Sequence, residues 1–279
     1  MTITVGVPFY GRRDLLARCV RSLTTQTYRD LRVLVIADGT SPGLTSFDPR
    51  VTVYRLPENR GAYFCRAVAL AATTTSHHAV IDSDDWVEPD FFEELMSHGK
   101  DAVQLSRFTE EDEHGKFLRV KQWKNARVPV SQRFRHYAPH IGVYETQRLL
   151  DAGGYSPAYR MGYDTFLSAV LRLQGLVHVS NHAGYHRTIR SDSLSQTEAT
   201  KIGSEIRERN KARLADSYDD VYRNRTKPDW VSWIIRGMTP EEAWEEVEYH
   251  AAQIRGGRTY RQRTTSTRPE LSSRSFLKP

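Results

Sequence analysis

The chain has 279 residues, 39% of them apolar, and a formal net charge of +6. This length suits one large domain, or one domain with a smaller extension. No run of about eighteen apolar residues occurs, so the sequence predicts no insertion into a membrane. The first residues, MTITVGVPFY, lack the features of a signal peptide. The two cysteines, Cys19 and Cys65, fall in expected helices, which favours a reducing, cytoplasmic compartment over a disulfide framework.

Strands and helices alternate through the first hundred residues. Period-two alternation and short apolar runs predict strands at residues 2–8, 31–38, 51–57 and 78–82. Helical periodicity predicts helices between and after them, at residues 12–27, 61–75 and 88–99. The alternation indicates a parallel α/β sheet with right-handed crossovers.

The remaining chain is less regular. We expect a hairpin between residues 101–108 and 116–123, and single strands at residues 140–145 and 176–187. Helices are expected at residues 146–154, 163–175, 200–218 and 239–257, the last with Thr239 as its cap and Pro240 at its first position. The composition divides the chain into a main domain at 1–198, a helical extension at 199–256 and a polar basic tail at 257–279.

The positive charge is concentrated at one end of the chain. Residues 255–279 hold seven arginines and lysines against Glu270 alone, which equals the whole formal excess. One interpretation is a solvated terminus. The other is a docking element for a polyanion such as nucleic acid, which would bind electrostatically because no readout motif for DNA or RNA is present.

Distinctive side chains follow three of the predicted strands. They are Pro8 and Tyr10 at the first strand, Asp38 at the second, and Asp82-Ser83-Asp84-Asp85 at the fourth. In open α/β sheets, ligands bind outside the carboxyl ends of the strands. Clustered carboxylates suit Mg²⁺ or Mn²⁺, which bind substrate phosphates, and a tyrosine can stack on a base. We therefore expect a nucleotide-diphosphate compound, although a capping cluster at 82–85 and a turn at Asp38 are simpler readings.

These segments resemble the family 2 glycosyltransferases of the GT-A fold over roughly residues 2–195. The likeness rests on VGVPFYGRRDLLARCVRSLTTQTY, LVIADGT, LPENRGAYFCRAVALA, the IDSDD form of the D-x-D signature, GGYSPAYRMGYDTFLSAVLRLQG and GYHRTIRSDSLS. The chain departs from the family at Ala37 and Tyr163, where an acid is usual, and at Ala67, where an asparagine is frequent. The resemblance implies a mixed, mainly parallel, Rossmann-like sheet flanked by helices, here with a C-terminal helical extension.

The resemblance also implies roles for single residues in an inverting, metal-dependent transfer. Asp164 would be the general base, although an acid that opens a helix is also stabilising for local reasons. Asp192 is a weaker candidate for that role. The other implied roles are nucleotide-sugar binding by Pro8, Tyr10, Asp38, Arg60, Asp82 and Ser83, metal binding by Asp82, Asp84 and His186, and acceptor contacts by Trp86 and His140. For His186, an ordinary surface histidine is an equal alternative.

The preferred activity is transfer from a UDP-sugar such as UDP-glucose to a hydroxyl of a saccharide or another acceptor. The alternative acceptor is a hydroxymethylated base, as used by DNA-modifying glycosyltransferases of some phages. A sugar-phosphate nucleotidyltransferase would need a glycine-rich basic loop after the first strand, and PFYGRRD has a single glycine. A non-catalytic nucleotide-sugar-binding module is the last alternative, because two of the family's acids are replaced.

Overall fold

The computed structural model describes residues 1–44, 48–99, 102–105, 107–122, 141–157, 159, 162–173, 178–193, 203–224 and 240–258. The described strands are β1 (Ile3–Phe9), β2 (Leu31–Ala37), β3 (Val51–Arg55), β4 (His77–Val80), β5 (Trp86–Val87), β6 (Ala102–Leu105), β7 (Arg107–Asp112), β8 (Phe117–Gln122), β9 (Gly142–Glu145), β10 (His178–Ser180) and β11 (Tyr185–Ile189). The described helices are α1 (Arg13–Thr24), α2 (Ala62–Ala71), α3 (Phe91–Ser97), α4 (Thr146–Asp151), α5 (Tyr163–Leu173), α6 (Glu205–Asn224) and α7 (Pro240–Arg255).

Seven strands form the central sheet, in the order β10-β6-β9-β4-β1-β2-β3. β1 pairs in parallel with β2 and with β4, and β2 pairs in parallel with β3. β9 lies antiparallel between β4 and β6. The predicted mixed, mainly parallel sheet flanked by helices is therefore confirmed. Every residue of β1 is buried, as expected for a central strand covered on both faces.

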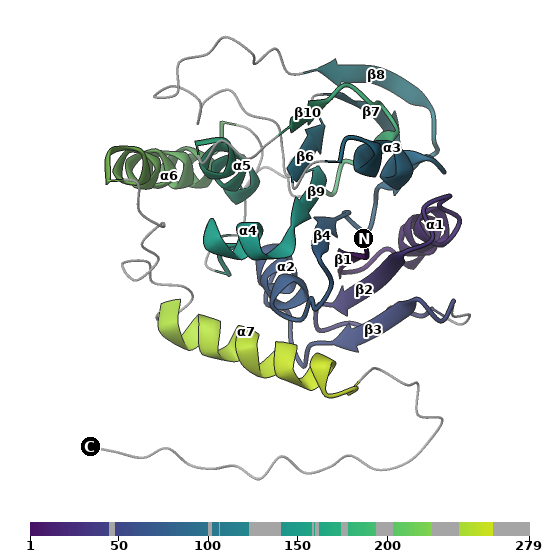
Figure 1. The fold of residues 1–279 in the computed structure, drawn as a ribbon, viewed down its shortest axis with the longest axis horizontal. Helices are drawn as coiled ribbons and strands as arrows, with labels where there is room; N and C mark the ends of the chain where they lie inside the picture. The colour runs from purple at the N-terminus through teal and green to yellow at the C-terminus, as the bar shows by residue number, and fades with distance from the viewer. Residues whose placement is uncertain are drawn as a thin grey trace.

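Helices cover both faces of this sheet (Figure 1). On one face, α1 and α3 pack on the strands through a cluster that includes Leu16, Leu23 and Phe92. On the other face, residues of α2, α5, α6 and α7 share one apolar cluster, with Phe166 and Val247 among its fully buried members. The two cysteines are buried and free, one in α1 and one in α2.

A second, four-stranded sheet has the order β5-β11-β7-β8. β7 and β8 form the predicted hairpin, but the segment before residue 106 forms β6 and joins the central sheet instead. The single strand predicted at residues 176–187 is wrong in the same way. It divides into β10, which pairs with β6, and β11, which pairs with β7. The strands after residue 100 are divided between two sheets, and the hydrophobic pattern of a strand does not indicate which sheet it joins.

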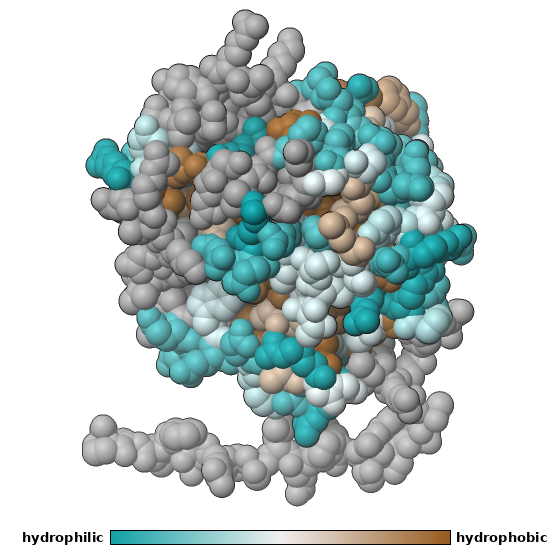
Figure 2. All heavy atoms as spheres, in the orientation of Figure 1, coloured by the Kyte–Doolittle hydropathy of each residue, from teal (hydrophilic) through white to brown (hydrophobic). Residues whose placement is uncertain are grey.

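The C-terminal helices pack on two helices of the preceding part of the chain, α6 on α5 and α7 on α2. α7 runs beside α2 (Figure 1), with Val247 and Ala251 fully buried, and Arg255 donates a hydrogen bond to the backbone oxygen of Ala71. Thr239, His140 and the tail beyond residue 258 lie outside the described residues. Among the helices that the structure describes, each is too short or too polar to cross a bilayer. The coloured part of the surface in Figure 2 is mainly polar, with small, separate apolar areas.

Candidate functional site

The structure brings the three predicted strand ends together. Parallel pairing places Phe9 opposite Ala37, and the backbone N–H of Asp38 donates to the Phe9 oxygen at 2.8 Å. On the other side of β1, the Ile81 N–H donates to the Gly6 oxygen at 3.1 Å, which places the 82–85 turn at the same edge. Two residues of β1 and its end therefore border the site, the buried Pro8 and the 67% exposed Tyr10.

Asp38 anchors the loop that leads into α2. Its Oδ1 accepts the Arg60 N–H at 2.6 Å and its Oδ2 accepts the Gly61 N–H at 2.9 Å. A carboxylate at this place satisfies N–H groups at the start of a helix and interacts favourably with the helix dipole. Gly39 permits the close approach, because its φ is +70° and a Cβ there would lie 2.6 Å from the backbone of Glu58. The predicted contact of Asp38 with a base stays a prediction.

The guanidinium of Arg60 points to the C-terminal helix. It forms ion pairs with Glu246 of α7 and, at 3.0 Å, with Glu58, and it lies 5.2 Å from the ring centre of Phe64. Its side chain is only 16% exposed. In this arrangement Arg60 connects the α2 loop to α7, and a contact with the nucleotide stays a prediction.

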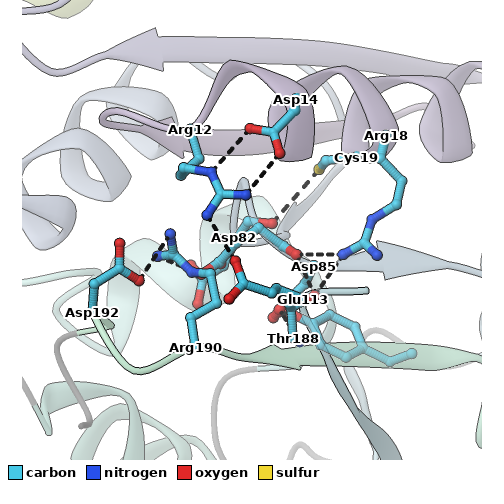
Figure 3. Close-up of polar contacts among 12 residues, drawn as sticks. Arg12, Asp14, Arg18, Cys19, Asp82, Asp85, Glu113, Thr188, Arg190 and Asp192 are labelled. Carbon is cyan, nitrogen blue, oxygen red and sulfur yellow. Dashed lines mark hydrogen bonds and ion pairs between the residues drawn. The ribbon is translucent and has the colours of Figure 1, made fainter. Parts of the chain in front are cut away.

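The 82–85 turn is held by its backbone between α1 and β11 (Figure 3). The oxygen of Asp84 accepts hydrogen bonds from Arg18 at 2.8 Å and from the Thr188 hydroxyl at 2.5 Å. The oxygen of Asp82 accepts from the Cys19 thiol at 3.6 Å. Because backbone atoms make these contacts, the turn is held without the carboxylates of Asp82 and Asp84, which contact other side chains.

Asp85 differs from its two neighbours, since its carboxylate has a structural role. Its Oδ2 accepts the Tyr185 hydroxyl at 2.5 Å and its Oδ1 accepts the Thr188 N–H at 2.8 Å. Burial, together with the charges of Asp84 and Asp82, raises the pKa of Asp85 well above its usual value. Asp85 therefore ties the turn to β11, a role that the sequence pattern does not distinguish from ligand binding.

Asp82 and Asp84 are the partly exposed carboxylates of the turn, at 34% and 24% exposure, with Ser83 partly buried between them. Arg66 of α2 donates to Asp82 Oδ1 at 2.5 Å, and Arg190 forms an ion pair with Asp84 at 3.1 Å. Burial and the charge of Asp82 raise the pKa of Asp84, against the lowering effect of Arg190. Two neighbouring carboxylates are thus each paired with an arginine, one from α2 and one from the residue after β11.

The donor set of this turn matches what Mg²⁺ or Mn²⁺ takes from proteins. Such ions are often bound by one or two carboxylates, with water and substrate phosphates completing the shell. Asp82 and Asp84 provide those carboxylates, and burial, followed by the charge of Asp82, raises the pKa of Asp84. Within the described ranges, no group of three or more His, Cys, Asp or Glu side chains is arranged to hold an ion by itself. A cation here would take its remaining oxygens from water and the substrate.

His186 and Trp86 form a stacked pair in the second sheet. Their rings are 3.7 Å apart and inclined by 14°. His186 Nε2 contacts Glu88 at 2.8 Å, and the Trp86 indole donates to Glu111 at 2.6 Å. These contacts explain both side chains as parts of the fold. Metal binding by His186 and acceptor contact by Trp86 stay predictions, as does the role of His140.

Asp164 lies in the first turn of α5 and is linked to the 82–85 turn through α2. The Tyr63 hydroxyl donates to Asp164 Oδ1 at 2.8 Å, and Arg66 lies 4.8 Å from the ring centre of Tyr63. Burial opposes the charge of Arg66, yet Asp82, Tyr63 and Asp164 together raise its pKa above the usual value. The charge of the buried Arg66 therefore interacts with the carboxylates of both Asp82 and Asp164.

Sequence reasoning missed the connecting role of Tyr63. Tyr63 and Arg66 are three residues apart on a predicted helix, which places both on one face. That spacing is visible in the sequence, but their partners lie 101 and 16 residues away. Tyr163, where the family has an acid, is fully buried and donates to the Gly154 oxygen at 3.0 Å.

Solved structures of S. aureus TarS share this fold. The complex of TarS 1–349 with UDP aligns with a TM-score of 0.55 at 17% identity, covering 80% of this chain and 72% of TarS 1–349. The complex with UDP-GlcNAc aligns with the same TM-score and identity, covering 91% and 81%. The architecture therefore defines a protein of the GT-A fold class.

Sequence comparison gives the family. The model of glycosyl transferase family 2 matches residues 4–163, more than half of the chain, and the chain belongs to this family. Glycosyltransferase GlyA of Streptococcus pneumoniae is 33% identical over 100 residues, which are 33% of this chain and 14% of GlyA. Succinoglycan biosynthesis protein ExoO of Rhizobium meliloti is 27% identical over 217 residues, 70% of this chain and 62% of ExoO. The chain thus spans less than two thirds of the length of these relatives.

Proposed function

We propose that the protein is an inverting, metal-dependent glycosyltransferase that moves a sugar from a UDP-sugar to a hydroxyl of its acceptor. The observation that carries the proposal is the arrangement of Asp82, Asp84 and Asp164. The first two carboxylates lie at the end of a central strand, and the third is joined to them through Arg66 and Tyr63. Family membership supports the reaction class. The TarS complexes with UDP and UDP-GlcNAc support the donor class.

In the proposed reaction, Asp164 accepts the proton of the acceptor hydroxyl. The acceptor oxygen forms a bond to the anomeric carbon from one side while the bond to the diphosphate oxygen breaks on the other. This single displacement inverts the anomeric centre, and no covalent enzyme intermediate is required. A positioned general base contributes typically about 10²–10⁴-fold to such a step. The chain provides the base from α5 and the donor site from the strand ends, so the two reactants meet between them.

Asp82 and Asp84 would hold Mn²⁺ or Mg²⁺ together with the donor's diphosphate. When bound, the ion supplies Lewis-acid stabilisation of the charge that develops on the leaving diphosphate. Arg66 and Arg190 form ion pairs with Asp82 and Asp84, which hold the two carboxylates in place. Tyr10, which is exposed at the end of β1, would stack on the nucleobase, and Asp38 fixes the neighbouring loop.

Asp164→Asn provides the direct test. We expect the variant to bind UDP-glucose or UDP-GlcNAc like the wild type and to lose transfer by about 100-fold or more, because the amide cannot take the proton. Binding is measured by thermal unfolding with Mn²⁺ and then with EDTA. Ligand at 100 times its dissociation constant stabilises by about 2.7 kcal/mol. GDP and dTDP serve as controls for the identity of the nucleobase.

Three outcomes would contradict parts of the proposal. Unchanged transfer by Asp164→Asn would show that Asp164 is not the general base. If Asp192→Asn abolishes transfer instead, Asp192 has that role. A nucleotide-induced shift of the unfolding temperature that EDTA does not change would contradict metal dependence. Binding without transfer to any saccharide or hydroxymethylated DNA acceptor would favour the non-catalytic module.

A further inference from the structure

We propose that Tyr63 is a positioning residue for the reaction, which holds the carboxylate of Asp164 in its productive orientation and joins it to the donor site. This inference rests on the proposed function, in which Asp164 is the general base. It concerns a side chain of α2 that the family resemblance does not single out. Four observations on Tyr63 and its neighbours carry it.

The Tyr63 hydroxyl makes two hydrogen bonds to the same residue. It donates to Asp164 Oδ1 at 2.8 Å and accepts the backbone N–H of Asp164 at 3.1 Å. The first N–H groups of a helix have no partner within the helix, so the hydroxyl also satisfies one of these groups in α5. Because one oxygen atom contacts both the side chain and the backbone of Asp164, it fixes the carboxylate relative to its own helix.

The position of this hydroxyl is itself fixed by packing. Tyr63 is only 4% exposed. Its ring lies 5.8 Å from the Tyr163 ring at an interplanar angle of 84°, an edge-to-face contact. The guanidinium of Arg66 also lies 4.8 Å from the ring centre. A buried aromatic ring with two such neighbours presents its oxygen in a single place.

The same helix face reaches the donor site. Arg66 donates to Asp82 Oδ1 at 2.5 Å and contacts the ring of Tyr63. The chain of contacts therefore runs from Asp82 through Arg66 and Tyr63 to Asp164. It connects the strand end that binds the donor with the helix that carries the base. Holding reacting groups in the correct geometry is a large part of catalysis, and an error of about 1 Å can cost about 100-fold in rate.

Tyr63 acts as a hydrogen-bond donor and not as a second base. Burial and the charge of Asp164 raise the pKa of Tyr63 well above its usual value, so the phenol stays protonated. A donor that contacts a carboxylate favours the ionised form, which is the form that accepts a proton. The two residues therefore have separate functions, with the proton moving to Asp164 alone.

Tyr63→Phe tests this role because it removes the hydroxyl and keeps the ring. We expect kcat to fall about tenfold to a hundredfold while KM for the UDP-sugar stays within about twofold. We also expect the acid limb of kcat/KM to move to higher pH, because the carboxylate loses a donor that stabilises its charge. Replacement by 3-fluorotyrosine, a more acidic phenol and a stronger donor, should move that limb to lower pH and keep most of kcat.

Tyr163→Phe is the matched control for stability. It also removes one buried tyrosine hydroxyl, at the first residue of α5, and that hydroxyl donates to the Gly154 oxygen. We expect a similar loss of thermal stability and an unchanged acid limb. If Tyr63→Phe and Tyr163→Phe have the same kinetics, or if 3-fluorotyrosine leaves the pH profile unchanged, the positioning role is overturned.

Failure of this inference is separable from failure of the proposed function. If the wild-type protein binds nucleotide without transfer, or if the Asp164→Asn variant is active, Asp164 is not the general base. This inference then fails together with the proposed function. An inactive Asp164→Asn variant beside a fully active Tyr63→Phe variant would retain the base and reject only the role of Tyr63. If Tyr63→Phe does not fold, the fluorotyrosine protein still gives the decisive pH profile.

Discussion

His78 shows how one buried titratable side chain controls the acid stability of this protein. It is fully buried in β4, its Nδ1 contacts the Thr73 hydroxyl at 2.9 Å, and its Nε2 has no partner among the described residues. Burial lowers the pKa of His78 from 6.5 to about 3. Between these two values the unfolded chain binds a proton that the folded protein does not bind. Acidification through this range therefore favours unfolding, whereas above it His78 is neutral in both states.

We predict that His78→Gln flattens the pH dependence of stability below pH 7. For the wild type, the missing proton lowers the free energy of unfolding by about 2 kcal/mol at pH 5 relative to pH 8. Glutamine can still contact Thr73 and does not titrate. Urea unfolding at pH 5 and pH 8 measures the difference, with the exposed His114→Gln as control. An equal slope in His78→Gln and wild type would contradict the assignment.

The positions of residues could be predicted where they depend on local sequence, and less well where they depend on distant partners. Asp82 and Asp84 follow a predicted strand and Asp164 starts a predicted helix, and the structure has them in these places, whereas their roles stay predictions. The partner of Arg60 could not be found in this way, because Glu246 is 186 residues away. The structural role of Asp85 likewise depends on Tyr185, 100 residues away.

At the scale of elements, α7 is attached to the main domain by polar contacts as well as by its apolar face. Arg60 forms an ion pair with Glu246, and the Tyr54 hydroxyl of β3 contacts His250 Nδ1 at 2.8 Å. Glu246 also lies 3.7 Å from His250 Nε2. Since Arg60 belongs to the loop that Asp38 anchors, α7 supports the loop beside the candidate base-binding site.

We predict that Arg60 and Glu246 act as one unit in stability. Both side chains are mostly buried, at 16% and 24% exposure, so removal of either weakens the charge compensation of the other, which keeps only Glu58 in the case of Arg60 or His250 in the case of Glu246 among the ion pairs described here. Arg60→Ala and Glu246→Ala should each lower the free energy of unfolding by about 1–2 kcal/mol, and the double variant by little more than either. The exposed Glu245→Ala of the same helix should stay within about 0.5 kcal/mol. Additive losses in urea unfolding would refute the coupling.

The same variants test the nucleotide contact predicted for Arg60. If its guanidinium leaves Glu246 to bind the donor, Arg60→Ala weakens UDP binding and Glu246→Ala does not. If its role is the attachment of α7, both variants weaken binding equally, through the loop that Asp38 holds. Thermal shifts with UDP in the two variants separate these results.

Elements were predicted well where local periodicity decides them, and poorly where strand pairing decides them. The helices and parallel strands of the first hundred residues follow from apolar spacing, and only their ends differ, as in α3, which begins at Phe91 rather than at Glu88. The strands after residue 100 belong to two sheets. Their assignment depends on partners across the fold, such as His186 opposite Thr109 in β11 and β7.

At the scale of the whole molecule, charge separates the chain into two unequal parts. Residues 255–279 carry the entire formal excess, while the residues before them sum to zero. Among the residues that the structure describes, many charges form ion pairs, including the arginines around the 82–85 turn. A polyanionic acceptor would therefore be attracted mainly by the C-terminal segment, since long-range attraction follows net charge.

We predict that shortening the chain after residue 258 lowers its affinity for duplex DNA without changing UDP binding. The cut removes five basic residues, namely Arg261, Arg263, Arg268, Arg274 and Lys278. Each one that contacts a phosphate contributes about 0.9 to the slope of log K against log salt concentration. Titrations from 50 to 200 mM salt, with unmodified and hydroxymethylated DNA, measure this slope. A full-length variant with these five residues changed to Gln should match the shortened chain, because charge and not length is the cause. Equal slopes for wild type and both variants would reject nucleic acid as the tail's partner and leave saccharides as the acceptors to test.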